Sequence, residues 1–249
     1  MSEDYKEAFE KTRVAGSIAA GALDEVAKII KPGIKTNKID EVCYNFIKDH
    51  GAYSAPLFYR GFPKSCCTST NHIVCHGIPS DKILNEGDIV NVDVTAFKDG
   101  WHGDTSRTFE IGETSVKAKK LVKTTHDAMM NAIKIVKENI YLGDIGATIQ
   151  SYVEAEGFSV VQDFCGHGIG KTFHKEPNVL HYGEKGTGEK IKAGMIFTIE
   201  PMINLGNYET KLLNDGWTAV TKDKTLSAQF EHTIGVTKDG YEIFTLSKN

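Results

Sequence analysis

The sequence of 249 residues lacks several features that assign proteins to special classes. Its five cysteines are odd in number and include no Cys-x-x-Cys pair, which argues against a disulfide framework and against a structural zinc site. We therefore expect reduced thiols and a cytoplasmic protein. No apolar run approaches the roughly 20 residues that a membrane span requires, and the charged start MSEDYKEAFEKT has no apolar core. The sequence thus predicts neither a signal peptide nor a membrane anchor.

Positive charge is also scarce, because 29 Lys and Arg residues stand against 33 Asp and Glu residues, a net charge of −4. The lysines are spread along the chain, whereas binding to a phosphate backbone needs them clustered, so nucleic acid is not a predicted partner. The glycine-rich stretch DFCGHGIGKTFH (163–174) does not supply a nucleotide site either. Cys165 stands where a P-loop needs its first glycine, and Lys171 stands where the Gly-x-Gly-x-x-Gly pattern needs its last.

What the sequence does contain is a repeated pattern of helices and strands. Apolar residues at steps of three to five predict four helices, at residues 4–30, 37–49, 116–140 and 145–156. Gly51 and Gly157 stop the second and the fourth of these helices. Segments rich in Val, Ile, Thr and aromatic residues predict six strands: HIVCHG, IVNVDVTAF, WHGDTSRTFEI, MIFTIEP, QFEHTIGV and YEIFTLS. Because the helix pair recurs, we predict one α+β domain built from two similar halves.

Four acidic residues interrupt these apolar strand sequences. The segment IVNVDVTAFKDGWHGDTSRTF predicts a hairpin with a Lys-Asp-Gly turn, which places Asp93 opposite Asp104 or within one residue of it. Like charges at that spacing are destabilising unless both are solvated on an exposed face, Arg107 pairs with one, or a cation lies between them. Glu200 in MIFTIEP and Glu231 in QFEHTIGV have the same apolar context. One metal site explains all four carboxylates most simply.

His167, between two glycines in CGHGIG, is the candidate nitrogen ligand for this acidic group. Glycine allows a close backbone approach or a positive φ, which suits a loop that presents an imidazole to a metal. We expect His50, His126 and His181 to be surface or packing residues. Four carboxylates and one neutral imidazole carry a charge of about −4, which two divalent cations would neutralise, and this mixture of oxygen and nitrogen suits Mn, Fe, Co or Zn.

The ordered set Asp93, Asp104, His167, Glu200 and Glu231 resembles the metallopeptidase family with the pita-bread fold, and most closely the type I methionine aminopeptidases. The motifs that carry the resemblance are NHIVCHGIP, VNVDVTAFKDGWHGDTSRTF, CGHGIGKTFHKEP, GMIFTIEPMI and QFEHTIGVT, and they span nearly the whole chain. The resemblance implies an α+β pita-bread fold, with two pseudo-symmetric helix-helix-strand halves around a central antiparallel sheet. It also implies that residues 1–249 are a single metallopeptidase catalytic domain.

The resemblance further assigns the ligands to two metal ions, which would be Co, Mn, Fe or Zn. Asp93, Asp104 and Glu231 would bind one ion, and Asp104 and Glu231 would bridge to a second ion that His167 and Glu200 complete. The implied reaction removes the N-terminal methionine from nascent proteins when the second residue is small. A metal-bound hydroxide would attack the first peptide bond, with Glu200 as the proton shuttle.

The remaining implied site residues surround the substrate. His76 and His174 would contact the scissile peptide as catalytic residues. An apolar cup suited to methionine would bind the substrate side chain, and the residues assigned to substrate binding are Tyr59, Phe62, Cys67, His76, Phe173, His174 and Trp217.

The resemblance also implies a cellular setting and leaves two alternatives. The expected protein is a cytoplasmic monomer that works near the ribosome on the N-termini of nascent polypeptides, without recognising a nucleic-acid sequence or a membrane. One alternative is a prolidase or aminopeptidase P with the same five ligands, although those relatives usually carry an additional N-terminal domain. The other is a binding protein of this fold that has lost catalysis, although such proteins characteristically lose ligands.

Overall fold

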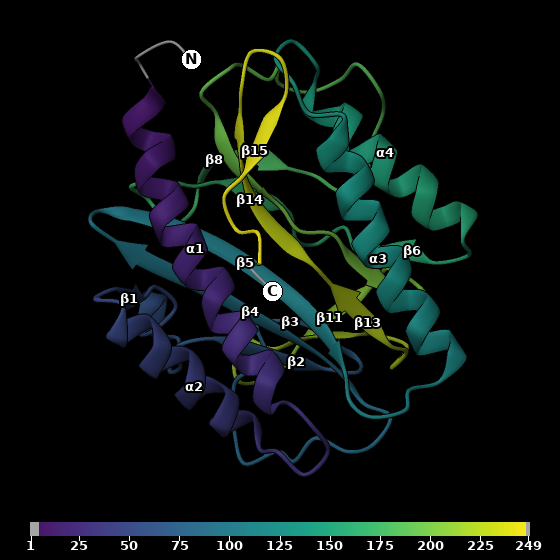
Figure 1. The fold of residues 1–249 in the computed structure, drawn as a ribbon. Helices are drawn as coiled ribbons and strands as arrows, with labels where there is room; N and C mark the ends of the chain where they lie inside the picture. The colour runs from purple at the N-terminus through teal and green to yellow at the C-terminus, as the bar shows by residue number, and fades with distance from the viewer. Residues whose placement is uncertain (1–4, 248–249) are drawn as a thin grey trace.

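Four α-helices are present in the computed structural model, which describes residues 5–247 (Figure 1). They are α1 (Lys6–Ile29), α2 (Thr36–Asp49), α3 (Val116–Lys134) and α4 (Leu142–Ala155). The four predicted helices are confirmed, although Asp4, the predicted start of the first, lies outside the described residues. Gly51 and Gly157 follow α2 and α4 with φ values of 64° and 84°, in the left-handed conformation that often ends a helix. No helix within the described part of the chain is long and apolar enough to cross a membrane.

The third helix is shorter than predicted. The apolar spacing predicts a helix to Ile140, but α3 ends at Lys134. Val136 and Ile140 still pack against the core, from a loop in which Asn139 has a φ of 75°. The prediction was wrong here because apolar loop residues that pack against the core continue the spacing of a buried helix face. The fourth helix begins three residues earlier than predicted, at Leu142.

The strands of residues 5–247 form one large sheet and two small ones, and all their pairings are antiparallel. The spatial order of the large sheet is β1-β4-β5-β14-β9-β7-β8, with β2 beside β4 and β15 beside β14. Its nine strands are β1 (Tyr53–Ser54), β2 (Cys67–Thr70), β4 (Ile89–Lys98), β5 (Trp101–Glu110), β7 (Gly166–Gly168), β8 (Lys175–Val179), β9 (Ile196–Ile199), β14 (Glu231–Val236) and β15 (Tyr241–Ile243).

The two small sheets have three strands each. The first, in spatial order, consists of β13 (Ser227–Gln229), β10 (Met202–Asn204) and β6 (Ser159–Val160). The second consists of β11 (Thr210–Leu212), β12 (Ala219–Thr221) and β3 (Ile73–Cys75). All six predicted strands are present, but several of the shorter ones, such as β2, β7 and β10, have no counterpart among the predictions.

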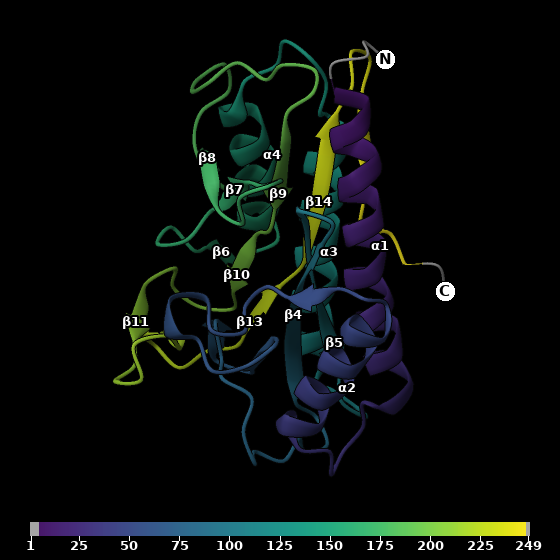
Figure 2. The same cartoon turned by 90° about the vertical axis from the view of Figure 1, so that its left-hand side faces the viewer.

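The helix pairs divide the fold into two halves (Figure 1). In the first half, α1 packs on β4 and β5 and α2 packs on α1; in the second half, α3 packs on β9, β10 and β13, and α4 packs on α3. Each half has its own apolar core. That of the first half includes Leu23, Val26, Ile39, Ile47, Val90 and Val92, and that of the second includes Leu121, Met129, Ile145, Ile149, Phe197 and Ile234. Figure 2 shows α1 running along the large sheet, on the side away from β8 and β11.

Strand β4 is largely buried on both faces, with valines on one face and Asn91, Asp93 and Thr95 on the other. Val90, Val92 and Val94 pack into the core beneath α1 and α2. Side chains alternate along a strand, so the residues between these valines point to the opposite face, where Asp93 and Thr95 line a cavity. The strand therefore carries a carboxylate on one face without interrupting the apolar core on the other.

The turn between β4 and β5 is tighter than predicted. Lys98 pairs with Trp101, so the turn consists of two residues, Asp99 and Gly100. Their φ values of 49° and 85° are the positive values that a type I′ turn requires and that match the twist of the two strands. The predicted three-residue Lys-Asp-Gly turn was wrong, and the pairing of every residue in the hairpin shifts with it.

The shifted register changes how the two acidic residues of the hairpin meet. Asp93 faces Ser106 and Asp104 faces Thr95, so the carboxylates are diagonal neighbours on one face and not directly opposite each other. Arg107 does not neutralise either of them, because its guanidinium pairs with Asp24 of α1, at 3.2 Å from Nη2 to Oδ1. The alternative in which arginine explains the two carboxylates is therefore excluded.

Candidate metal centre

The five predicted metal ligands line one cavity of about 390 Å³. Asp93 and Asp104 come from the β4–β5 hairpin of the first half. His167 lies in the middle of β7, Glu200 directly follows β9, and Glu231 is the first residue of β14, all in the second half. Pairing of β14 with β5 joins the halves and brings the two groups of side chains to one place.

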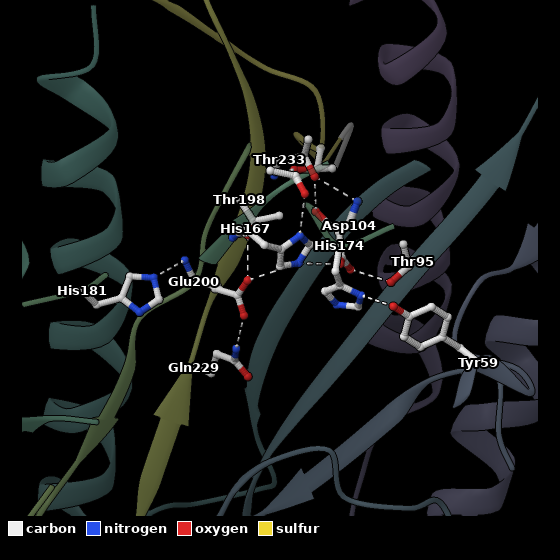
Figure 3. A network of polar contacts seen from close by, with 12 residues as sticks. Tyr59, Thr95, Asp104, His167, His174, His181, Thr198, Glu200, Gln229 and Thr233 are labelled. Carbon is white, nitrogen blue, oxygen red and sulfur yellow. Dashed lines mark hydrogen bonds and ion pairs between the residues drawn. The ribbon is translucent and has the colours of Figure 1, made fainter. Parts of the chain in front are cut away.

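Three of the predicted ligands form a compact group. Asp104, His167 and Glu231 each offer one ligand atom, these atoms lie within 4.8 Å of one another, and all three residues are buried. His167 Nε2 also lies 3.6 Å from Asp104 Oδ2 and 3.5 Å from Glu200 Oε1 (Figure 3). At these distances, His167 Nε2 could bind the same cation as either carboxylate oxygen. Asp93 lines the same cavity outside this compact group.

The protonation of the carboxyl groups indicates that the cluster is short of positive charge. Burial raises the pKa of Glu231 and that of Asp93 well above their usual range, and the neighbouring carboxylates raise both further. Burial also raises the pKa of Glu200 to about 7, although His167 and a hydrogen bond from Thr198 oppose the increase. Without a cation the cluster therefore retains protons at a pH where isolated carboxyl groups are ionised.

Glu231 supplies a direct test of whether a cation fits. Its Oε1 is buried and has no hydrogen-bond partner among the described residues. A buried carboxylate oxygen without a partner is costly, and a divalent cation would satisfy it. The donor set of carboxylate oxygens and one imidazole nitrogen is typical of sites for divalent transition metals. The residues present thus fit a divalent cation.

Threonine hydroxyls contact and orient the predicted ligands (Figure 3). Thr95 Oγ1 donates to Asp104 Oδ1 at 2.7 Å. Thr198 Oγ1 accepts the backbone N–H of His167 at 2.9 Å and donates to Glu200 Oε1 at 2.7 Å. The sequence analysis missed both threonines, yet a signal was present: each lies two residues along the chain from a predicted ligand, and positions two apart in an extended segment share a face.

The glycines beside His167 allow strands to approach closely, and neither has a positive φ. A methyl group on Gly166 would overlap the backbone oxygen of Thr198, and one on Gly168 would overlap that of Glu176. Gly168 O lies 3.1 Å from His167 Nδ1 as its acceptor, so Nε2 faces the carboxylates. Burial opposes the charged form of His167, but the hydrogen bond to Asp104 and the charge of Glu200 outweigh it and raise the pKa of the ring. Of the two predicted roles for these glycines, positive φ is wrong, and the close approach that the structure shows is between neighbouring strands.

The residues predicted to bind substrate all line the same cavity: Tyr59, Phe62, Cys67, His76, Phe173, His174 and Trp217. Phe62 and Trp217 meet edge to face, with ring centroids 5.2 Å apart, and Tyr59 lies 4.9 Å from Phe173. Aromatic rings therefore form an apolar wall beside the carboxylates. The cavity is also lined by residues that the sequence analysis did not select, among them Arg60, Cys75, Phe164, Met202 and Gln229.

The predicted catalytic histidines are uncharged near neutral pH. His174 Nδ1 is 3.0 Å from the hydroxyl of Tyr59, and partial withdrawal from water together with the nearby His167 lowers the pKa of His174 to about 4. Burial lowers the pKa of His76, which the backbone holds at a φ of 56°. Their catalytic roles stay predictions.

The three histidines that were predicted to be surface or packing residues differ among themselves. His50 and His126 are exposed, as expected of surface residues. His181 is completely buried, which fits the alternative expectation of a packing residue. Its Nε2 also accepts the backbone N–H of Glu200 at 3.1 Å, a contact with a predicted ligand that the sequence did not suggest.

Comparison with known proteins connects this site to one family. Residues 10–238 match metallopeptidase family M24. The chain is 58% identical over 240 residues to the methionine aminopeptidase of Rickettsia prowazekii, a match that covers 96% of this chain and 93% of the relative. A crystal structure of methionine aminopeptidase from the same organism has a TM-score of 0.96 and 57% identity, and covers 97% of this chain and 98% of that chain.

A more distant structure shares the fold alone. A prolidase from Pyrococcus furiosus has a TM-score of 0.79 at 22% identity, and the match covers 98% of this chain and 65% of that chain. These two structures confirm the predicted α+β pita-bread fold. The resemblance to methionine aminopeptidases is confirmed as well, by the identity over nearly the full length. On this sequence match and this shared fold, the chain belongs to metallopeptidase family M24.

Proposed function

We propose that this protein is a metal-dependent aminopeptidase that removes the N-terminal methionine from newly made proteins when the second residue is small. The observation that carries the proposal is the presence of all five ligand-type side chains in one cavity with an aromatic wall. The relatives that match nearly the full chain are methionine aminopeptidases, which supports the same activity here. Residues 1–249 would then serve as a single catalytic domain.

Membership of the metallopeptidase family implies a divalent metal ion. We propose two ions, held by Asp93, Asp104, His167, Glu200 and Glu231, and drawn from Co, Mn, Fe or Zn. The proposal is supported by the number of carboxylates, since one cation would leave the buried cluster negatively charged. When bound, such cations would act as Lewis acids and make a hydroxide nucleophile available near neutral pH.

The side chains of the cavity would carry the proton transfers. Glu200, whose carboxyl group lines the cavity, would accept a proton from the nucleophile and deliver it to the departing amine. If the Tyr59 hydroxyl donates to Nδ1 of the neutral His174, the proton of that ring is on Nε2. Nε2 can then donate to the developing oxyanion, and His76 is proposed to contact the peptide from its own side of the cavity.

The aromatic wall would bind the methionine side chain. Phe62 and Trp217 present apolar ring surfaces, and the sulfur of a thioether makes favourable contacts with aromatic edges. The thiol of Cys67 is buried beside Asp93, which together with burial raises its pKa, so it would contribute an uncharged apolar surface. An unbranched side chain suits such a pocket.

We further propose a cytoplasmic monomer that meets its substrates, the N-termini of nascent polypeptides, near the ribosome. The monomer is supported by the cavity, which a single chain lines from both halves. The cysteines support a cytoplasmic location, since all five thiols are free and disulfides are rare in that compartment. The substrate class supports a site of action near the ribosome, because the N-termini of nascent polypeptides first become available there.

The test is hydrolysis of Met-Ala-Ser, compared with Ala-Pro-Ala and Gly-Pro, by metal-free protein and after addition of Mn, Fe, Co or Zn. We expect methionine release from the first peptide only, and only with metal. Cleavage before proline would select the prolidase or aminopeptidase P alternative. Binding of metal and peptide without hydrolysis of any of the three would select the non-catalytic alternative.

A further inference from the structure

The residue that departs most from its expected role is His181. It lies two residues beyond β8, its side chain is completely buried, and its Nε2 accepts the backbone N–H of Glu200 at 3.1 Å. In Figure 3 the ring lies on the side of Glu200 away from His167. His181 therefore touches a predicted ligand from outside the cavity, through the main chain.

Glu200 needs such a partner because the chain changes sheets at this point. Strand β9 ends at Ile199 in the large sheet, and β10 begins at Met202 in a small sheet. Glu200 and Pro201 between them belong to neither strand, and proline has no N–H to anchor the link. The imidazole of His181 takes the place that a strand carbonyl has elsewhere, as the acceptor for the N–H of Glu200.

The contact defines the state of the ring. A nitrogen that accepts a hydrogen bond carries no proton, so neutral His181 has its proton on Nδ1. Burial lowers the pKa of His181 to about 3, consistent with an imidazole that stays neutral. An apolar side chain would fill the same space without the cost of burying two ring nitrogens, so packing alone does not account for histidine at this position.

His181 holds Glu200 in a way that the other contacts do not. Thr198 Oγ1 and Gln229 Nε2 donate to the two carboxylate oxygens of Glu200, at 2.7 Å and 3.3 Å, and so use lone pairs that a cation or a proton also needs. His181 contacts only the backbone. Its support therefore persists whichever proton or cation the carboxylate binds.

We propose that His181 is a positioning residue of this site: by accepting the backbone N–H of Glu200, its imidazole aims the carboxylate for cation binding and for proton transfer. The inference rests on the proposed function, and it adds to that function a residue outside the cavity. Outer contacts that orient metal ligands typically change metal affinity or activity by ~10–100-fold when removed.

Two substitutions of similar shape test the proposal. His181→Gln can place an amide oxygen where Nε2 lies, whereas His181→Met places a methyl group there. We expect His181→Met to lower kcat for Met-Ala-Ser and the affinity of the metal-free protein for Mn²⁺, measured by calorimetry, by about 10-fold or more. We expect His181→Gln to stay within about 3-fold of the wild type on both measures, because the acceptor is kept. KM should change little in either variant, since no substrate contact is lost.

Three results would overturn the proposal: unchanged kcat and Mn²⁺ affinity in His181→Met, equal losses in both variants, or a loss confined to KM. The control is His50→Met, at an exposed histidine that does not line the cavity, which should match the wild type. A wild type that binds Mn²⁺ but releases no methionine would contradict the proposed function, while the Mn²⁺ affinities of the variants would still decide the role of His181.

A measurement on the wild type covers the case in which His181→Met does not fold. In ¹⁵N-labelled protein, metal-free and with Zn²⁺, we expect a scalar coupling between the amide nitrogen of Glu200 and Nε2 of His181, and a proton on Nδ1. A proton on Nε2 in both states would overturn the proposal without any substitution.

Discussion

The two halves of the molecule hold their predicted ligands in different ways. In the first half, Asp93 and Asp104 lie inside two ten-residue strands that pair along their whole length. In the second half, His167 lies in a strand of three residues, Glu200 lies between two strands, and Glu231 begins a strand. The first half thus places its carboxylates by strand register, and the second half places its ligands where regular pairing starts or stops.

Side chains make up for the missing pairing in the second half. Thr198 accepts the N–H of His167, and His181 accepts the N–H of Glu200. Asp104 is an instructive exception in the first half, because its N–H donates at 2.9 Å to Thr233 Oγ1 of β14, where the halves join. A ladder of backbone bonds tolerates exchange of one side chain, whereas a ligand held by one hydroxyl or one imidazole does not. Single substitutions of supporting residues should therefore be more damaging in the second half.

The largest effect is expected for Glu231, where the halves meet. Glu231 pairs with Ser106 of β5 and offers a buried carboxylate to the compact ligand group. We expect Glu231→Ala to lower methionine release at least about 1000-fold, because a bound cation contributes several kcal/mol to such reactions. Metal content and peptide hydrolysis should fall together. Glu209→Ala, which removes an exposed carboxylate paired with Lys222, is the control, and retained activity in Glu231→Ala would show that this ligand is wrongly assigned.

The second expected effect is a loss of stability of the metal-free protein as the pH rises. Because burial raises the pKa of Glu200 from 4.5 to about 7, the folded state binds more protons than the unfolded state between these values. This stability is complete below the lower pKa and is lost as the pH passes through the higher one, by on the order of 3 kcal/mol for Glu200 alone. Urea unfolding between pH 4 and pH 8, with and without Mn²⁺, measures it.

Variants of the two halves sharpen this measurement. Glu200→Gln in the second half and Asp93→Asn in the first should each flatten the pH dependence, because burial raises the pKa of both carboxyl groups. Bound Mn²⁺ should remove most of it by taking the place of the protons. A metal-free protein equally stable at pH 5 and pH 8 would contradict the description of the cluster as short of positive charge.

The smallest of the three effects compares two threonines directly. Thr198 orients both His167 and Glu200, whereas Thr95 donates only to Asp104, which the hairpin already holds. We expect Thr198→Val to lower Mn²⁺ affinity and kcat by about 10–100-fold, and Thr95→Val to lower them by less than about 10-fold. The two variants serve as controls for each other. Equal losses, or a larger loss in Thr95→Val, would remove the contrast between the halves.

The contrast also explains which parts of the fold the sequence predicts. The long strands β4 and β5 are rich in β-branched and aromatic residues, and their predicted bounds differ from the observed ones by one residue. The prediction of which residues face Asp93 and Asp104 across the hairpin was still wrong, because the sequence KDG can form a turn of two residues or of three. Strands of two or three residues, such as β7 and β10, carry too little pattern to be predicted, since pairing with distant neighbours decides them.

The residues of the candidate site also divide into those that the sequence predicts and those that it does not. All five ligand-type residues were selected from acidic residues in apolar contexts and from one histidine between glycines, and all five line the cavity. The residues that orient them were not selected. Thr198 could have been found from its same-face spacing to Glu200, but His181 could not, since its contact joins two segments 19 residues apart that share no periodic pattern. Contacts of this kind depend on the path of the chain between sheets.

The register of the β4–β5 hairpin also restricts how this gene can change in length. Side chains alternate along a strand, so inserting or deleting one codon between Asp93 and Lys98 of β4, or between Trp101 and Asp104 of β5, would turn that carboxylate away from the cavity and toward the core under α1. Loops outside the strands, such as residues 183–189, have no alternation of side chains between two faces that a change in length would disturb. The protein can therefore change in length at its loops during evolution. The strands of the hairpin tolerate exchange of residues but not a change in their number.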